Sequence, residues 1–346
     1  MDLRSVTLEQ LNSDLALVGE KSFRAKQIYE WVHKKCARNV DEMTNISVAL
    51  RQKLLELYEF QGFEIARMQE SKIDGTRKYL FKLSDGNMIE SVLMRYHHGN
   101  SVCISSQVGC RMGCAFCAST IDGLARNLTP GEMLGQIYEI QRDCGERVSN
   151  VVVMGSGEPM DNFDNLLTFI QMLTDDKGLN ISQRNITVST CGLVEKIKEL
   201  ADKQLQITLA LSLHATTDER RKQLMPIANR YSIPEVMEAC KYYFEKTGRR
   251  VTFEYSLVAG VNDSQQEAEA LSKLAKPIGA HINLIPVNPI KERDYKSTDM
   301  RYVHRFKNIL EKNRINVTIR REMGRDIQGA CGQLRQSYID KKEGGR

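Results

Sequence analysis

The chain has 346 residues, of which 41% are hydrophobic and 27% charged, and its formal net charge is +5. These values are typical of a soluble globular protein. No apolar run is long enough to span a bilayer, and the first residues lack the apolar segment of a secretory signal, so we expect a cytoplasmic protein. Nine cysteines in a reducing compartment do not indicate a disulfide framework, which directs attention to metal, redox or catalytic roles.

The first hundred residues divide into two segments of different character. Residues 1–60 carry apolar side chains at helical spacing, and we expect a small helical accessory domain there. Residues 61–100 alternate apolar and polar side chains around Asp85-Gly86, which predicts a β-hairpin linker segment.

From residue 101 onward, six short β-rich runs alternate with helical patterns, beginning at SVCISSQ and ending at HINLIP. Such alternation predicts an α/β fold with a parallel sheet, built either as a partial barrel or as an open doubly wound sheet. A seventh run, NVTIRR, leads toward the C-terminus. We therefore expect one α/β domain over 101–325 and a C-terminal tail over 326–346.

Polar and glycine-rich motifs stand at the ends of four of these predicted strands. GSGEP follows VVVM, STCG closes NITV, SLH ends ITLAL, and VNP follows NLIP. In α/β barrels the carboxyl ends of the strands carry the active site. We therefore expect the functional residues to gather at this edge of the sheet.

The strongest motif is CRMGCAFC, which directly follows the first barrel strand and spaces Cys110, Cys114 and Cys117 as C-x3-C-x2-C. Three thiolates do not complete a four-cysteine zinc site, whereas a four-iron cluster bound by three cysteines keeps one iron open to another ligand. Phe116, between the last two cysteines, fits packing beside a cofactor. A zinc site that borrows a distant fourth ligand is the alternative.

This spacing after the first strand of a partial barrel resembles the radical S-adenosylmethionine (SAM) superfamily. The segments SVCISSQVGCRMGCAFCAST, MGSGEP, STCG, SLHA, NLIPVNP and ACGQL occur in this order. Together they resemble the dual-specificity RNA methyltransferases, which methylate C2 of adenosine in 23S rRNA and in tRNA, and the likeness covers essentially the whole chain. The resemblance implies a partial (β/α)6 barrel that binds one [4Fe-4S] cluster and SAM.

The resemblance also implies individual roles. The cluster ligands would be Cys110, Cys114 and Cys117. The residues that hold SAM would be Gly157, Glu158, Ser189, Ser212, Leu213, His214 and Asn288. Cys331 would carry the methyl group, Cys103 would be its disulfide partner, and Glu90 would accept a proton. The cysteines without a partner pattern are Cys36, Cys144, Cys191 and Cys240, of which Cys191 lies inside STCG.

The chemistry explains why two further cysteines are needed. C2 of adenine is electron-poor and a weak nucleophile, whereas a thiolate takes a sulfonium methyl group by ordinary displacement. The resemblance implies that one SAM methylates Cys331 and that a second is cleaved to a radical, which activates this methyl group for addition to C2. A base, Glu90, and a second thiolate, Cys103, would then release the RNA and leave a transient disulfide. Cluster and disulfide both require an external electron donor of the flavodoxin type.

The segment 291–325 contains eleven Lys or Arg residues against five Asp or Glu residues, which indicates an acidic partner such as nucleic acid. We expect it to hold RNA phosphates, with residues 1–60 as a further RNA-binding element. The target adenosine, in the peptidyl-transferase centre of 23S rRNA or the tRNA anticodon loop, has to be unpaired or flipped to reach a barrel interior. We expect the protein to be a monomer.

Three alternatives stay open at this point. The related resistance methyltransferases modify C8 of the same rRNA adenosine with the same cysteines, although the proline of GSGEP and the segment RDIQGACGQL are closer to the C2 enzymes. A non-enzymatic zinc-binding RNA-binding module would be colourless and hold zinc. A radical enzyme that acts on a small molecule or peptide is disfavoured by the basic segment and by the pair Cys103 and Cys331.

Overall fold

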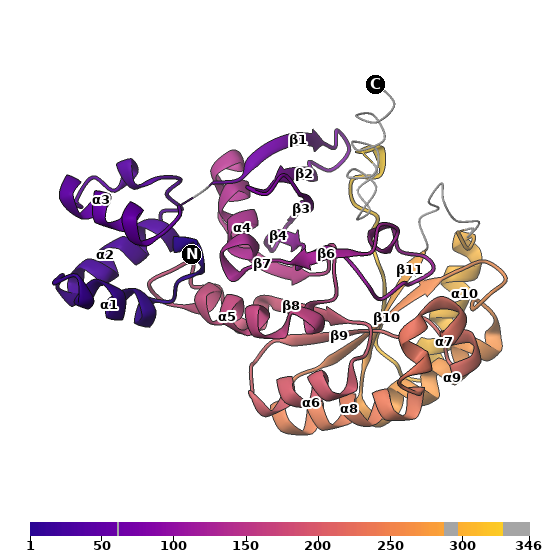
Figure 1. Ribbon diagram of the computed structural model, residues 1–346. Helices are drawn as coiled ribbons and strands as arrows, with labels where there is room; N and C mark the ends of the chain where they lie inside the picture. Colours follow the sequence, from indigo (N-terminus) through magenta and orange to yellow (C-terminus); the bar gives the residue numbers. More distant parts are fainter. Residues whose placement is uncertain (61, 287–296, 328–346) are drawn as a thin grey trace.

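The computed structural model describes residues 1–60, 62–286 and 297–327, and its central feature is a ten-stranded sheet in the order β1-β2-β3-β4-β7-β8-β9-β10-β11-β12 (Figure 1). The strands are β1 Glu64–Glu70, β2 Arg77–Lys82, β3 Met88–Tyr96, β4 Gly99–Ile104, β7 Val148–Val153, β8 Ile186–Thr190, β9 Thr208–Ser212, β10 Val251–Leu257, β11 His281–Pro286 and β12 Val317–Ile319. A separate pair is formed by β5 Gln107–Gly109 and β6 Leu124–Asn127.

All neighbouring strands from β4 to β12 pair in parallel. These seven strands coincide with the seven β-rich runs of the sequence, and the helices between them occupy the expected gaps. The helices of this part are α4 Pro130–Cys144, α5 Phe163–Thr174, α6 Val194–Asp202, α7 Asp218–Leu224, α8 Ile233–Thr247, α9 Gln265–Ala275 and α10 Met300–Lys312. The expected α/β partial barrel is confirmed, with β12 as an additional parallel strand.

The antiparallel strands β1–β3 extend the barrel sheet at one edge. β2 and β3 form the expected hairpin around Asp85-Gly86, where Gly86 adopts φ +83°, a conformation that favours glycine. The structure adds β1 on one side of this hairpin and pairs β3 with β4 on the other. The pairing of β3 with β4 makes the antiparallel strands part of the main sheet. It also satisfies backbone N–H and C=O groups that an unpaired edge of β4 would expose.

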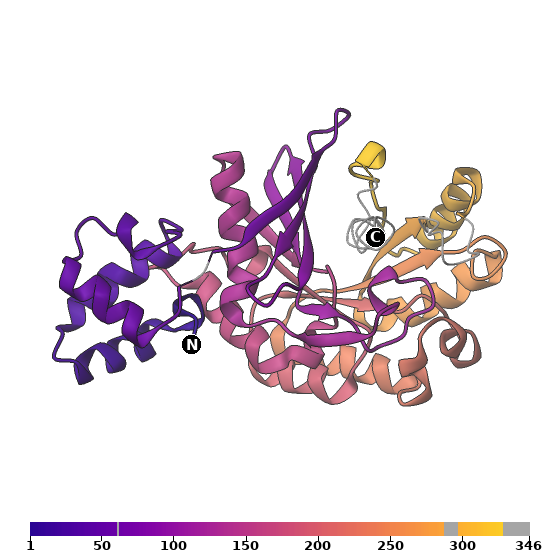
Figure 2. The same ribbon diagram turned by 45° about the horizontal axis from the view of Figure 1, so that its top comes forward.

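The helices lie on the convex side of the curved sheet (Figure 2). Local sequence sets their ends: α4 begins with a capping box of Thr129 and Glu132 and ends at Gly145, which is left-handed with φ +69°. α8 repeats this arrangement with Ser232 and Glu235. Since the helices cover the convex side, the concave side of the sheet is left for the functional site.

The N-terminal helices form a group beside α4 and α5 (Figure 1). They are α1 Leu8–Leu17, α2 Ser22–His33 and α3 Val48–Leu57. Their apolar side chains belong to the same hydrophobic core as those of the barrel, and Nδ1 of His33 lies 2.7 Å from the hydroxyl oxygen of Tyr138 on α4. Within the described ranges, no helix is long and apolar enough to cross a membrane.

Candidate active site

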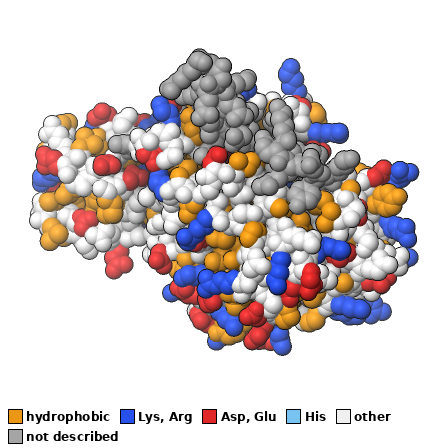
Figure 3. Space-filling view, turned by 45° about the vertical axis from the view of Figure 1, so that its right-hand side comes forward, with side chains coloured by type: hydrophobic (Ala, Val, Ile, Leu, Met, Phe, Trp, Pro, Cys, Tyr) orange, Lys and Arg blue, Asp and Glu red, His pale blue; other side chains and the backbone are white. Residues whose placement is uncertain are grey.

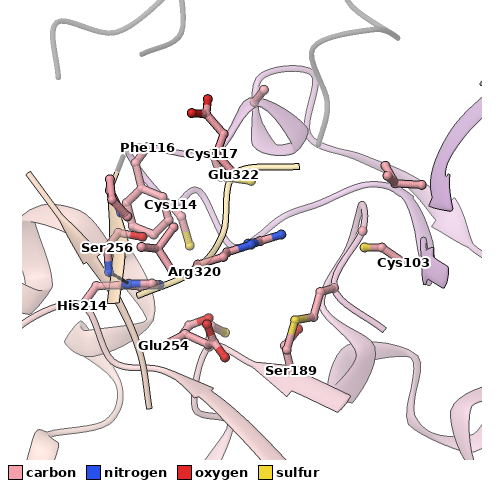
Figure 4. A pocket seen from close by; sticks show the side chains of 18 of the residues that line it. Cys103, Cys114, Phe116, Cys117, Ser189, His214, Glu254, Ser256, Arg320 and Glu322 are labelled. Atoms are coloured by element: carbon pink, nitrogen blue, oxygen red, sulfur yellow. Dashed lines mark hydrogen bonds between the residues drawn. The ribbon is translucent and has the colours of Figure 1, made fainter. Parts of the chain in front are cut away.

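A cavity of ≈ 890 Å³ lies at the carboxyl ends of the parallel strands, on the concave side of the sheet (Figure 4). The predicted site residues that line it are Cys103, Cys110, Cys114, Cys117, Gly157, Glu158, Ser189, Ser212 and His214. They come from the end of β4, the loop between β5 and β6, and the ends of β7, β8 and β9. The topology of parallel strands therefore brings together residues that are far apart in the sequence.

The three cysteines of the CxxxCxxC motif lie on the loop that joins β5 to β6. Backbone hydrogen bonds hold this loop, from the N–H of Cys110 to the carbonyl oxygen of Gly123 (2.9 Å) and from the N–H of Ala115 to that of Leu224 (2.8 Å). Burial raises the pKa of Cys110 to about 12 and that of Cys114 further. These two thiols are therefore protonated in the metal-free protein, and metal binding has to displace the protons.

The number of thiols at the cavity bears on the metal group that they can hold. Cys110, Cys114 and Cys117 all line the cavity. Three thiolates do not complete a four-cysteine zinc site, whereas a four-iron cluster bound by three cysteines keeps one iron open to another ligand. The donor set therefore fits the cluster.

Gly157 and Glu158 follow β7 and form a tightly built corner of the cavity. Gly157 has φ +105°, and a Cβ atom there would lie 2.5 Å from Cβ of Gln107. The carboxylate of Glu158 accepts hydrogen bonds from the N–H groups of Cys191 (2.7 Å) and Met160 (3.1 Å). Burial raises the pKa of Glu158, and these hydrogen bonds oppose the shift. A buried carboxylate held in this way fits a cationic group such as the ammonium of SAM.

His214 lies at the end of β9, and its ring faces the cavity. Its Nδ1 accepts a hydrogen bond from the N–H of Ser256 (2.9 Å), which leaves the proton on Nε2 as a donor (Figure 4). The ring of Phe116 packs edge-on against it with 4.7 Å between centroids. Burial lowers the pKa of His214 to about 3, with a further contribution from Arg221. His214 is therefore a neutral hydrogen-bond donor at physiological pH.

Cys103 lies across the cavity from Cys114, and the side chain of Arg320 reaches between them (Figure 4). Cys103 is 4% exposed and is buried beside Val92 and Met94 of the neighbouring strand β3. This thiol therefore lines the same cavity as the three motif cysteines.

Glu90 lies on the same face of β3 as Val92 and Met94, because alternate residues of a strand share a face. Both of those residues line the cavity, but Glu90 itself does not. Its carboxylate is buried and forms an ion pair with Lys78 on β2 (3.2 Å). The structure thus puts the expected proton acceptor next to the cavity lining.

Like Glu90, Leu213 is a described residue of the predicted site that does not line the cavity. Leu213 is fully buried, and its backbone N–H donates to the carbonyl oxygen of Glu254 (3.1 Å). Asn288 and Cys331 lie outside the described residues. The part of the basic segment at 291–296 also lies outside them.

Among the charged side chains of the cavity, Glu254 was not predicted from the sequence, and Arg320 was predicted only as part of the basic segment 291–325. Glu254 on β10 is buried, accepts a hydrogen bond from Asn283 (2.8 Å), and has a pKa raised by burial. Arg320 follows β12 and lowers this pKa. A single acidic residue within the apolar run RVTFEYSLV was the signal that could have indicated Glu254.

Surface charge gives a less distinct pattern than the cavity. On the face shown in Figure 3, the coloured Lys and Arg side chains are spread out and interleaved with Asp and Glu. Near the cavity, however, Arg320, Arg321 and Arg325 belong to the lining and have exposed side chains. Glu322 lies among them and is 3.9 Å from Arg325, so this segment borders the cavity with three positive charges and one negative charge.

Comparison with known proteins identifies the family. Residues 104–271 match the family model of the radical SAM superfamily, and residues 1–60 match that of the ribosomal RNA large subunit methyltransferase N-terminal domain. A "Probable dual-specificity RNA methyltransferase RlmN" of Lachnospira eligens is 66% identical, with 99% of both chains covered. The chain belongs to the RlmN family of dual-specificity RNA methyltransferases. A relative of the same description from Lachnoclostridium phytofermentans is 63% identical, with 99% of this chain and 96% of that relative covered.

A solved structure agrees with this family. The crystal structure of a radical SAM methyltransferase from Sphaerobacter thermophilus is 41% identical and superposes with a TM-score of 0.92, covering 96% of this chain and 98% of that one. The family resemblance and the enzyme class expected from the sequence are confirmed: the chain is a radical SAM RNA methyltransferase. Its cofactors are a [4Fe-4S] cluster and SAM, as expected.

Proposed function

We propose that the family's reaction, methylation of C2 of an adenosine in 23S rRNA and in tRNA, runs in this chain through Cys331, Cys103 and Glu90. The observation that carries the proposal is the position of Cys103, which lines one cavity with Cys110, Cys114 and Cys117. The matched relatives are described as dual-specificity enzymes, which favours C2 over C8. The substrate sites are an adenosine of the peptidyl-transferase centre and one of the anticodon loop.

The cofactors are held by groups from several strand ends. Cys110, Cys114 and Cys117 bind the cluster, and Gly157, Glu158, Ser189, Ser212, Leu213, His214 and Asn288 form the SAM site. When bound, cluster and SAM supply a methyl group and, from a second SAM, a radical that removes a hydrogen atom. Glu158 is supported as the partner of the SAM ammonium by its buried, hydrogen-bonded carboxylate. Leu213, which lies behind the cavity wall, contributes through its backbone.

The chain's own residues carry out the remaining steps. Cys331 takes the methyl group on its sulfur and becomes covalently joined to C2 of the adenine through that carbon. Glu90 accepts the proton that this carbon or the ring carbon loses. The unpaired electron that the addition leaves on the ring would be taken up by the oxidised cluster. The Cys103 thiolate then attacks the sulfur of Cys331: the S–S bond forms, the S–C bond breaks, and the carbon leaves on the RNA with the bonding electrons and takes up a proton to become the methyl group. An external donor of the flavodoxin type restores both thiols.

RNA is bound by two surfaces. Arg320, Arg321 and Arg325 at the cavity contact phosphates while the adenosine is presented unpaired. On residues 1–60, the exposed lysines of and beside α2 form a second contact surface. They are Lys21, Lys26, Lys34 and Lys35. We propose the domains 1–60, 61–100, 101–325 and 326–346, a monomeric state, and action in the cytoplasm, where a catalytic disulfide is restored by reduction.

The decisive experiment replaces Cys103 by alanine. C103A should still methylate its own Cys331 and attack RNA, but it should accumulate a covalent protein–RNA adduct because no second thiolate resolves it. Denaturing electrophoresis with labelled RNA measures the adduct, and digestion of product RNA distinguishes 2-methyladenosine from 8-methyladenosine. The double variant C103A/C331A should form no adduct, and C144A serves as the matched control. Normal turnover by C103A would refute the resolving role.

A further inference from the structure

Behind the cysteine loop lies an arginine that is completely removed from solvent. Arg221 on α7 is 0% exposed. The same short helix supports the loop, because the carbonyl oxygen of Leu224 accepts the hydrogen bond from Ala115 (2.8 Å). Cys114 and Cys191 pack together with Leu224 in one apolar cluster. Arg221 is thus held close to a cysteine of the motif without reaching the cavity.

The guanidinium group of Arg221 is only partly satisfied. Its Nη2 donates to the carbonyl oxygens of Cys191 (2.6 Å) and Ser212 (3.5 Å), whereas Nε and Nη1 have no hydrogen-bond partner among the residues that the structure describes. Arginine keeps its charge in proteins, and a buried charge without a counter-charge is costly. This position therefore calls for a negative group.

Burial lowers the pKa of Arg221, and the charge of Asp218, on the same helix, raises it. Asp218 nevertheless forms no salt bridge with Arg221, and its carboxylate accepts the N–H of Ile233 (2.7 Å). The carboxylate of Glu158 accepts the N–H of Cys191 (2.7 Å). Glu158 also faces the proposed SAM site, where a ligand ammonium would balance its charge. Within the described ranges, Arg221 forms no salt bridge.

We propose that Arg221 is the counter-charge of the iron–sulfur cluster and raises its reduction potential. The proposal rests on the cluster being bound by Cys110, Cys114 and Cys117. Three thiolates make the cluster anionic, and one-electron reduction adds a negative charge without breaking a bond. A buried cation stabilises the reduced form more than the oxidised form, because Coulomb interactions are strong in a low dielectric.

The geometry places this charge behind the loop rather than in the cavity. The guanidinium group is held by the carbonyl oxygens of Cys191 and Ser212, and Cys191 packs against Cys114 in the same apolar cluster. The charge of Arg221 is therefore fixed beside the loop that carries the three proposed ligands.

The test is the midpoint potential of the anaerobically reconstituted cluster, measured by a dithionite titration followed by electron paramagnetic resonance. R221M fills the buried volume without charge, R221Q keeps a donor for Cys191, and R221K keeps the charge. The matched control is R220Q, because Arg220 is the adjacent arginine and already forms an ion pair with Glu267. In the neutral variants we expect the ratio of reduced to oxidised cluster to fall about tenfold at a fixed potential, which corresponds to about 59 mV.

R220Q should keep a potential near that of the wild type, and R221K should lie closer to the wild type than either neutral variant does. An unchanged potential in a cluster-loaded R221M or R221Q would overturn the proposal. The proposal would also be overturned if the potential of R221K were as low as those of R221M and R221Q. The loss of a hydrogen bond, rather than the loss of charge, would then explain the effect. Iron and sulfide contents separate this outcome from a failure of the proposed site: if C114A still binds the cluster, the ligand assignment itself is wrong.

Discussion

Two parts of the molecule each bury an arginine near a histidine, but among the residues that the structure describes only the arginine of one part, Arg4, forms a salt bridge. At the junction between the N-terminal helices and α4, Arg4 lies 3.8 Å from Glu139, which also accepts two hydrogen bonds from Arg38 (2.6 and 2.9 Å). His33 is buried there against Tyr138. The junction thus contains its own counter-charge.

The region behind the cysteine loop also buries an arginine and a histidine, but no carboxylate pairs with its arginine within the described ranges. Arg221 contributes to the lowered pKa of His214, as Arg4 does for His33. No salt bridge to Arg221 occurs among the residues that the structure describes, and its nearest acceptors are backbone carbonyl groups. A buried charge that the chain neutralises itself is structural, whereas one that it leaves open indicates a ligand. By this criterion, Arg4 serves to dock the N-terminal helices, whereas Arg221 serves the catalytic site.

The largest effect is expected from removing Cys114, one of the three proposed cluster ligands. Cys114→Ala should reduce bound iron and sulfide to background and abolish RNA methylation, because the cluster loses one of its three proposed protein ligands. Metal analysis and the absorbance of the anaerobic protein measure the result. Cys240→Ala is the control, since Cys240 is also fully buried but lies on α8 in the hydrophobic core. Wild-type iron content in C114A would show that Cys114 is not a cluster ligand. Arg221 could then not be contrasted with Arg4 as an arginine that a ligand neutralises.

The second largest effect is expected at the junction. Glu139→Gln keeps the shape of the side chain but leaves the buried Arg4 without its counter-charge, which should lower the free energy of unfolding by about 3–5 kcal/mol. Chemical denaturation measures this change, and cluster content should stay at the wild-type level. Glu146→Gln is the matched control. Its carboxylate pairs with Arg95 at the surface, where such a pair contributes at most about 1 kcal/mol. If E139Q and E146Q lost the same free energy of unfolding, burial of the Arg4–Glu139 pair would not increase its contribution to stability.

Short-range sequence patterns were sufficient to predict the parts of the site that lie at strand ends. The spacing of Cys110, Cys114 and Cys117, and the motifs after β7, β8 and β9, belong to single loops, so their positions follow once strands and helices alternate. The same holds for the hairpin around Asp85-Gly86.

Other features depend on packing between distant segments. Arg221 meets Cys191 only because α7 folds back over the end of β8, and nothing in DERRKQL indicates which of its two arginines is buried. Glu139 is likewise one acidic residue among several on α4, and its role arises from Arg38 on another element. The place of β1 in the sheet was not predicted. Its residues are mostly half-exposed, so the strand has no clear apolar face, and only its pairing with β2 fixes its position.

The smallest effect concerns the pH dependence of stability at the junction. Burial, aided by Arg4, lowers the pKa of His33 to about 3, below the unfolded value of 6.5. Between these values the unfolded state binds more protons than the folded state, so stability rises with pH and is lost as the pH falls through this window. A fully titrating group of this kind contributes about 1.4 kcal/mol per pH unit.

His33→Gln keeps a polar partner for Tyr138 but does not ionise. The free energy of unfolding of H33Q should therefore fall less steeply with acidification than that of the wild type, by about 1.4 kcal/mol per unit between roughly pH 5.5 and 4. Denaturant unfolding at a series of pH values, with both proteins in the same cluster state, measures the two slopes. H98Q, which removes an exposed histidine, is the control for loss of a histidine as such. Identical slopes for H33Q and the wild type would show that His33 is protonated in the folded junction. A protonated His33 would then add a third positive charge to those of Arg4 and Arg38, and Glu139 would no longer balance the charge of the junction.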